Sequence, residues 1–167
     1  DLDISFYGKS KDSFNYVISR IHLEREKSVA RITHTGKVVG ELELNIPGEH
    51  NLFNATAALA AATKLGATVS ETLNGLSEFS GARRRFELKG NQGGVRVVDD
   101  YGHHPTEVAV TLQTARRYVG SGKLHVIFQP HRFTRTQIFA EQFADALELA
   151  DQIYLLEDTL ETWKCFE

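Results

Sequence analysis

Short runs in which apolar and polar residues alternate occupy the first 48 positions of the chain. The clearest run, residues 38–46, reads Val-Val-Gly-Glu-Leu-Glu-Leu-Asn-Ile, and further β-like runs cover residues 4–7, 16–18 and 29–32. When apolar and polar residues alternate with a period of two, successive side chains lie on opposite faces of a strand. Residues 34–37, His-Thr-Gly-Lys, supply a turn between the last two runs. This pattern predicts an antiparallel meander with one face in solvent.

Two helices are predicted to follow the meander. Residues 47–49, Pro-Gly-Glu, stop the last strand, and residues 51–65 form an Ala-rich stretch that Gly66 ends. Residues 70–79 predict a second helix, with Ser70 as the N-cap and three apolar residues on one side.

The pattern changes character near Gly81. Strands are predicted at residues 85–89 and 95–99, joined by a Gly-rich turn, and a helix at residues 106–119 begins next to a proline. A continuous apolar run at 124–128 predicts a strand buried on both faces. A helix at 134–149 and a strand at 153–156 complete the order. Alternating strands and helices are typical of a parallel α/β sheet, so we place a domain boundary near Gly81.

Composition narrows the function classes. Hydrophobic residues make up 41% of the 167 residues, enough for a packed core, and 19 basic against 22 acidic residues give a net charge of −3. This balance excludes a protein whose affinity comes from neutralising many phosphates of a nucleic acid. The single Cys165 can form no internal disulfide and has no partner thiols for a zinc site. The chain has no Met and begins at Asp1, which we interpret as a segment of a longer protein.

Two loops that follow predicted strands carry most of the candidate chemistry. Residues 99–105 read Asp-Asp-Tyr-Gly-His-His-Pro, and residues 129–136 read Gln-Pro-His-Arg-Phe-Thr-Arg-Thr. Ligands of open parallel sheets bind beyond the carboxyl ends of the strands, so neighbouring strands would bring both loops to one crevice. If the second helix begins by Arg132, then Arg132 and Arg135 share a face and could clamp a carboxylate or a phosphate.

Each of these features also has a plain structural interpretation. A His-Pro pair at a helix start is often a cap, and paired Asp residues at a strand end are often N-caps. Residues 83–85, three arginines, would usually be a solvated surface. Asn51 and Asn54, one helical turn apart, could be a cap and a surface residue. The combination of two such loops nevertheless favours a functional site.

Four motifs together resemble the Mur ligases, and the resemblance extends from about Phe6 to Leu156. Within the family they are most similar to the branch that adds L-alanine to UDP-N-acetylmuramate, rather than to the branch that re-attaches recycled murein tripeptide. The motifs are residues 47–55 (PGEHNLFNA), 84–87 (RRFE), 99–108 (DDYGHHPTEV) and 128–136 (FQPHRFTRT).

The resemblance implies both a fold and a reaction. The fold would be α/β: the later half of an ATP-binding central domain at residues 1–80, a β meander plus helices, followed by a Rossmann-like, mostly parallel and truncated C-terminal domain at 81–167. In peptidoglycan synthesis in the cytoplasm, the family uses ATP and Mg²⁺ to phosphorylate the carboxylate of UDP-N-acetylmuramate, and L-alanine then attacks the acyl phosphate. The implied nucleotide-binding residues are Asn51, Asn54, Arg84, Arg85 and Asp100, and the implied amino-acid site comprises Tyr101, His103, His131, Arg132 and Arg135.

The family's Gly-rich phosphate loop, with its Gly-Lys-Thr-type end, has no complete counterpart in these 167 residues. The resemblance also implies that the UDP-binding domain and the magnesium ligands are missing, and the family pattern fades after Glu157. We therefore expect this chain alone to be inactive, to bind no cofactor tightly, and to self-associate through an exposed face of residues 1–80. Two alternatives stay open: a non-catalytic module that binds nucleotides or carboxylates, and a relative of folylpolyglutamate synthase, which the two loops disfavour.

Overall fold

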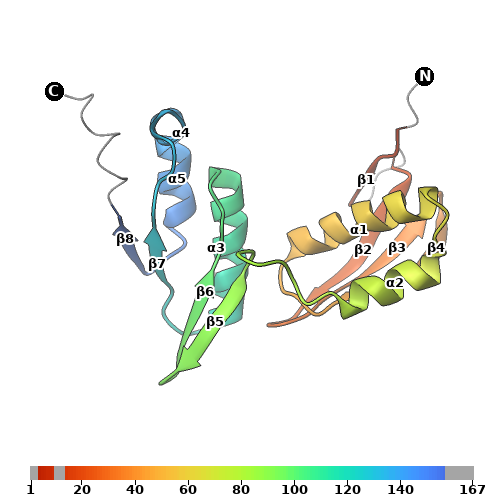
Figure 1. Ribbon diagram of the computed structural model, residues 1–167, viewed down its shortest axis with the longest axis horizontal. Coiled ribbons are helices and arrows are strands. Elements are labelled where there is room, and N and C mark those ends of the chain that lie inside the picture. Colours follow the sequence, from red (N-terminus) through yellow and green to blue (C-terminus); the bar gives the residue numbers. More distant parts are fainter. Residues whose placement is uncertain (1–3, 10–13, 157–167) are drawn as a thin grey trace. The chain divides into compact units, whose positions relative to one another are not determined.

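The computed structural model describes residues 4–9 and 14–156, and the chain forms two compact units (Figure 1). Unit 1 comprises residues 1–82, and unit 2 comprises residues 83–167. Each unit has its own hydrophobic core. The segment 158–167, where the family pattern fades and which contains Cys165, lies outside the described residues.

Unit 1 contains a four-stranded sheet in the order β1-β2-β3-β4. Its antiparallel part confirms the predicted meander, and the β3–β4 hairpin turns through Thr35 and Gly36, both with positive φ, as a two-residue hairpin loop requires. The edge strand β1 differs, because it pairs parallel to β2. A parallel pair needs a longer connection than a hairpin, and that connection lies between Gly8 and Tyr16. The strands are β1 (Tyr7–Gly8), β2 (Tyr16–Leu23), β3 (Ser28–His34) and β4 (Lys37–Leu44).

Two helices, α1 (Glu49–Lys64) and α2 (Val69–Glu78), pack on one face of this sheet. The sequence places apolar residues of α1 on one side, and Leu52 and Leu59 are fully buried there against the inward side chains of β2, β3 and β4. The N-cap of α2 is Thr68 rather than Ser70: Thr68 Oγ1 accepts a hydrogen bond from the Glu71 amide at 3.2 Å, and a Glu71 carboxylate oxygen accepts one from the Thr68 amide at 3.0 Å. This reciprocal pair of hydrogen bonds is a capping box. It is formed by Thr68 and Glu71, and Ser70 takes no part in it.

Replacing Thr68 with alanine tests this capping box. We expect the free energy of unfolding of unit 1 to fall by about 1 kcal/mol, because the Glu71 amide loses its side-chain acceptor. The matched control is Ser70→Ala, which removes an exposed hydroxyl two residues later and is expected to change stability by less than about 0.5 kcal/mol. Urea unfolding of the three proteins provides the comparison, and a larger loss for the Ser70 variant would contradict the assignment.

Unit 2 alternates strands and helices, but its strands form two separate pairs. The hairpin strands β5 and β6 are antiparallel, β7 and β8 are parallel, and within residues 83–156 no hydrogen-bonded ladder joins β6 to β7. The predicted adjacency of the strands at 95–99 and 124–128 is therefore wrong. The elements are β5 (Glu87–Gln92), β6 (Val95–Asp99), α3 (Pro105–Val119), β7 (His125–Phe128), α4 (Phe133–Ile138), α5 (Ala140–Leu147) and β8 (Gln152–Leu155).

The core of unit 2 forms between α3, α5 and one face of β7. Val108 and Leu112 of α3 meet Phe143 and Leu147 of α5, and Val126 and Phe128 pack against this cluster from β7. The opposite face of β7 is bare, since Ile127 is 71% exposed. The prediction that this strand is buried on both faces is thus wrong, because the described helices pack only on one side.

The single helix predicted at 134–149 is also wrong, because the chain forms α4 and α5 with a break at Phe139. There φ is −110° and ψ is 23°, outside helical values, and the Phe139 ring packs on the His104 ring with centroids 5.0 Å apart. Among the described residues, no helix has the length and apolarity needed to cross a membrane.

Candidate functional site

The loop that leaves β6 is held by the carboxylate of Asp100. One Asp100 oxygen accepts the Phe86 amide at 2.8 Å and the other accepts the Gly102 amide at 2.7 Å. A side chain at Gly102 would not fit easily, because its Cβ would lie 2.9 Å from an Asp100 oxygen. The residue expected to contact the nucleotide is therefore also the clamp that joins the start of β5 to the loop after β6.

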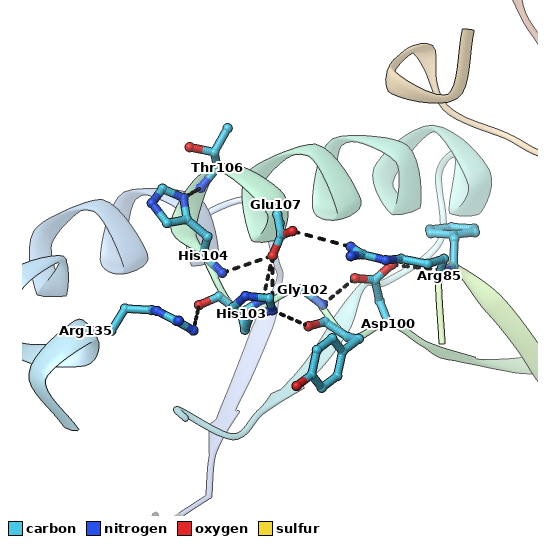
Figure 2. A network of polar contacts seen from close by, with 10 residues as sticks. Arg85, Asp100, Gly102, His103, His104, Thr106, Glu107 and Arg135 are labelled. Carbon is cyan, nitrogen blue, oxygen red and sulfur yellow. Dashed lines mark hydrogen bonds and ion pairs between the residues drawn. The ribbon is translucent and has the colours of Figure 1, made fainter. Parts of the chain in front are cut away.

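A second carboxylate, Glu107, organises the start of α3 (Figure 2). One Glu107 oxygen accepts the amides of His103 at 3.0 Å and His104 at 3.2 Å, and His104 Nδ1 in turn accepts the Thr106 amide at 3.3 Å. His104 is the N-cap and Pro105 occupies the first helical position, where its missing N–H costs nothing. These bonds pair backbone amides that a helix start would otherwise leave without partners.

The same contacts set the ionisation of Glu107. Burial by itself raises the pKa of this carboxyl, but the backbone amides of His103 and His104 and the charges of His103 and Arg85 outweigh burial. The net result is a pKa below the ordinary value for glutamate.

This lowered pKa predicts a pH-dependent contribution to the stability of unit 2. A carboxyl whose folded pKa is depressed stabilises the fold fully above its unfolded pKa, about 4.3, and loses that contribution as the pH falls through the lower folded pKa. We therefore expect the stability difference between wild type and Glu107→Gln to be largest near neutral pH and to shrink in acid. Urea unfolding across this range measures it. Glu141→Gln, at an exposed carboxylate in the first turn of α5, is the matched control, and an equal pH-dependent difference there would contradict the assignment.

Arg84 and Arg85 flank this network with exposed guanidinium groups. The Arg85 guanidinium lies 3.5 Å from a Glu107 oxygen, and that of Arg84 sits over the Tyr101 ring, 4.7 Å from its centroid. Arg84 also has a φ of 56°, in the left-handed region that favours glycine. Its amide donates to Glu87, and its carbonyl accepts the Tyr101 amide at 2.8 Å, so the strained turn is held from both sides.

The loop that leaves β7 contacts the first loop through Arg135. Its Nη1 donates to the His103 carbonyl oxygen at 3.3 Å (Figure 2). Arg132 is exposed and is the N-cap of α4 with a φ of 68°, so it lies outside the helix that contains Arg135. Arg132 and Arg135 were expected to share a helical face only if the helix included Arg132, and this condition is not met. His131 precedes it in the same loop and is exposed.

The structure thus brings together most of the residues that the sequence singled out in unit 2. Tyr101 and His103 have ring centroids 5.2 Å apart, and the His103 backbone joins the two loops. Asn51 and Asn54 belong to unit 1, on α1, where the Asn51 side-chain amide donates to the Pro47 carbonyl at 2.7 Å and Asn54 is exposed.

Sequence reasoning missed Glu107 as a member of this site. Its signal was present, since a glutamate three residues after a candidate N-cap, just before an apolar run, is the pattern of a capping box. The signal was hidden because histidine is not among the usual N-cap residues.

The described residues include no group of three or more His, Cys, Asp or Glu side chains that could hold a metal ion. The site offers the guanidinium groups of Arg84, Arg85 and Arg135 near two carboxylates, Asp100 and Glu107, that hold the backbone amides of the loop. Planar guanidinium groups with several N–H donors suit carboxylates and phosphates.

Comparison with known proteins identifies relatives of this chain. Residues 84–164 match the family model described as Mur ligase, glutamate ligase domain. The UDP-N-acetylmuramate–L-alanine ligase of Kineococcus radiotolerans is 56% identical over 122 residues, which cover 73% of this chain and 26% of that protein. The chain therefore spans only about a quarter of the length of this relative.

Solved structures show the same relationship. The UDP-N-acetylmuramate–alanine ligase of Thermotoga maritima superposes with a TM-score of 0.78 at 36% identity, over 91% of this chain and 34% of that chain. A MurF ligase of Thermotoga maritima, solved in complex with ADP, superposes with a TM-score of 0.72 at 20% identity, over 91% of this chain and 35% of that chain. The second likeness concerns the fold alone.

Proposed function

Because this chain belongs to the Mur ligase family, we propose that it forms part of an ATP-dependent ligase that joins L-alanine to UDP-N-acetylmuramate in peptidoglycan synthesis. In this proposal residues 1–80 are the later half of the central ATP-binding domain and residues 81–167 belong to the C-terminal domain. The reaction would take place in the cytoplasm. ATP would supply the phosphoryl group that activates the muramate carboxylate.

The observation that carries the proposal is the junction of the two loops at His103 and Arg135. It holds two sets of polar side chains at one place, as a site for a small carboxylate substrate requires. We assign Tyr101, His103, His131, Arg132 and Arg135 to the L-alanine site. Of the two arginines, Arg132 is exposed, and its contacts with α4 are made by its backbone carbonyl, so its guanidinium is the better donor for the alanine carboxylate.

The nucleotide side of the proposal uses the exposed guanidinium groups of Arg84 and Arg85 for phosphate or ribose, together with Asn51 and Asn54 for adenine. The side chain of Arg84 is 58% exposed and that of Arg85 is 52% exposed, which leaves N–H donors available on both. Asp100 fits less simply, since each of its oxygens already accepts a backbone amide; each still has a second lone pair for a ribose hydroxyl. We assign no magnesium ligand to the described residues.

A chimera tests the proposal. The chain replaces the corresponding segment of the Kineococcus radiotolerans ligase, and phosphate release is measured with ATP, UDP-N-acetylmuramate and L-alanine. We expect turnover that requires all three substrates, and an Arg132→Gly variant with kcat/KM for L-alanine lowered about tenfold, as loss of one charged hydrogen bond predicts. The thermal stability should stay unchanged, because glycine accepts the φ of 68° at this position. The KM for ATP should also stay unchanged, because Arg132 is assigned to the L-alanine site.

Arg117→Ala is the matched control, since Arg117 is an exposed arginine in the last turn of α3. Unchanged alanine kinetics in the Arg132 variant, or equal losses in both variants, would contradict the assigned site. We expect the isolated chain to release no phosphate, because it contains no complete Gly-rich phosphate loop. Calorimetry on the isolated chain separates the remaining alternative: nucleotide or alanine binding without activity in the chimera would indicate a non-catalytic binding module.

A further inference from the structure

The short helix α4 carries the two arginines that we assign to the L-alanine site. Arg135 lies within the helix, and at its start the Arg132 carbonyl accepts the amides of Arg135 and Thr136, both at 3.1 Å. None of the six residues of α4, all of which the structure describes, is buried. Helices in proteins are stabilised mainly by packing of an apolar face, so the direction of α4 depends on a few specific contacts.

Two contacts join the end of α4 to the start of α3. The first is the hydrogen bond from Arg135 Nη1 to the His103 carbonyl oxygen at 3.3 Å (Figure 2). The second is made by Phe139, whose ring meets the His104 ring edge to face, with the ring centroids 5.0 Å apart and the ring planes at 61°. The Phe139 amide donates to the Arg135 carbonyl at 3.0 Å, so the two contacts are one helical turn apart.

Both rings of this pair are attached to fixed parts of unit 2. Phe139 is half-buried and packs against the buried cluster of α3 and α5, and its carbonyl accepts the Phe143 amide at 2.9 Å. His104 is held at the start of α3, where its Nδ1 accepts the Thr106 amide and its own amide donates to Glu107. The ring pair therefore links the hydrophobic core to the helix that contains Arg135.

We propose that Phe139 is a positioning residue for the ligation reaction. Its ring, held against that of His104, fixes the direction of α4. The guanidinium groups of Arg132 and Arg135 are thereby placed at the alanine carboxylate, and Phe139 itself touches no substrate. Such placement matters because a displacement of about 1 Å can cost on the order of a hundredfold in rate. The proposal rests on the proposed function, since it concerns the same L-alanine site.

Kinetics of the chimera with the Kineococcus radiotolerans ligase test the proposal. Phe139→Leu keeps an apolar side chain against the core and removes the ring contact. We expect the KM for L-alanine to rise about threefold to tenfold, as loss of one aromatic pair predicts, and the KM for ATP to change less than about twofold.

Phe143→Leu is the matched control. Phe143 is buried in the same core, but its ring lies against Phe128, with centroids 5.3 Å apart. This variant is expected to lower thermal stability at least as much as Phe139→Leu and to leave the KM for L-alanine unchanged. An equal rise of this KM in both variants would show that Phe139 only fills the core, and the proposal would fail.

A double-mutant cycle tests whether Phe139 acts through His104. His104→Asn removes the ring but keeps a preferred N-cap residue at the start of α3. We expect this variant to raise the KM for L-alanine as Phe139→Leu does, and the double variant to raise it no further than either single variant. Effects that multiply in the double variant would overturn the proposal.

Amide exchange in the chain alone separates this proposal from the proposed function. In Phe139→Leu the amides of Arg135, Thr136 and Phe139 should exchange at least about fivefold faster relative to those of α5, whereas in Phe143→Leu both helices should accelerate together. Unchanged relative exchange in α4 would refute positioning by Phe139, whether or not the chimera is active. Selective acceleration in α4 with a chimera that ligates no alanine would support the role of the ring pair in fixing α4 and contradict the proposed function.

Discussion

Replacing Leu59 with alanine is expected to lower the free energy of unfolding of unit 1 by about 2–5 kcal/mol. Leu59 is fully buried on the inner face of α1, in the core shared with β2, β3 and β4. The substitution removes buried methyl groups and leaves a cavity that the sheet can fill only in part, so both the transfer and the cavity contributions are lost. Native-state amide exchange of the strands of unit 1 measures the change.

The matched control is Leu65→Ala at the end of the same helix. Leu65 is 88% exposed, and its truncation is expected to change stability by less than about 0.5 kcal/mol. Because α3 and α5 build a separate core, amides in unit 2 should keep their exchange rates in the Leu59 variant. Comparable losses at Leu59 and Leu65 would show that the inner face of α1 is not packed as described.

The second large effect is expected at Asp100. Its replacement by alanine leaves the amides of Phe86 and Gly102 without their charged acceptor, and we expect a loss of about 2–3 kcal/mol in the stability of unit 2. Amide exchange at these two residues should accelerate most. The effect does not need ATP, because the bonds lie within the chain.

Asp99→Ala provides the control for Asp100. Asp99 is the adjacent residue, and within residues 83–156 its carboxylate forms only ion pairs, with Arg84 at 3.6 Å and Lys89 at 3.9 Å. Such pairs at the surface contribute about 1 kcal/mol or less. If Asp100→Ala left stability and exchange unchanged but weakened nucleotide binding in the chimera, the carboxylate would act as a ligand contact rather than as the clamp of the loop.

The fold of unit 1 could be predicted from local sequence to a large extent. The turn at Thr35 and Gly36 and the alternation of β4 are local signals, and the structure follows both. The parallel pairing of β1 could not be predicted in this way, because the alternation of apolar and polar residues identifies a strand but not the direction in which it pairs.

The gap between β6 and β7 was unpredictable for a different reason. Periodicity identifies strands and their order along the chain, but the order of strands across a sheet depends on long-range pairing. The apolar run at 124–128 correctly predicted a strand, and its second face is bare because no described element packs there. The two loops were nevertheless predicted to meet, and they do so although their strands are not paired. The contact is made by the Arg135 side chain, which donates a hydrogen bond to the His103 carbonyl.

Asp100 shows the limit of residue-based inference at the site. Its residue type and its place after β6 suggested a ligand contact, and both features are equally suited to the clamp that the structure contains. The sequence alone cannot distinguish these roles, because they differ only in which backbone amides lie within hydrogen-bond distance.

The meander of unit 1 also has a consequence for the time course of folding. β2, β3 and β4 are consecutive, and their two connections are short, so their pairing closes only small loops. The parallel pair β7–β8 forms only after the chain between them, with α4 and α5, has been brought around. Rates of folding fall as contacts become more distant in sequence, so unit 1 is expected to reach its native pairing sooner and, during synthesis, before unit 2 has left the ribosome.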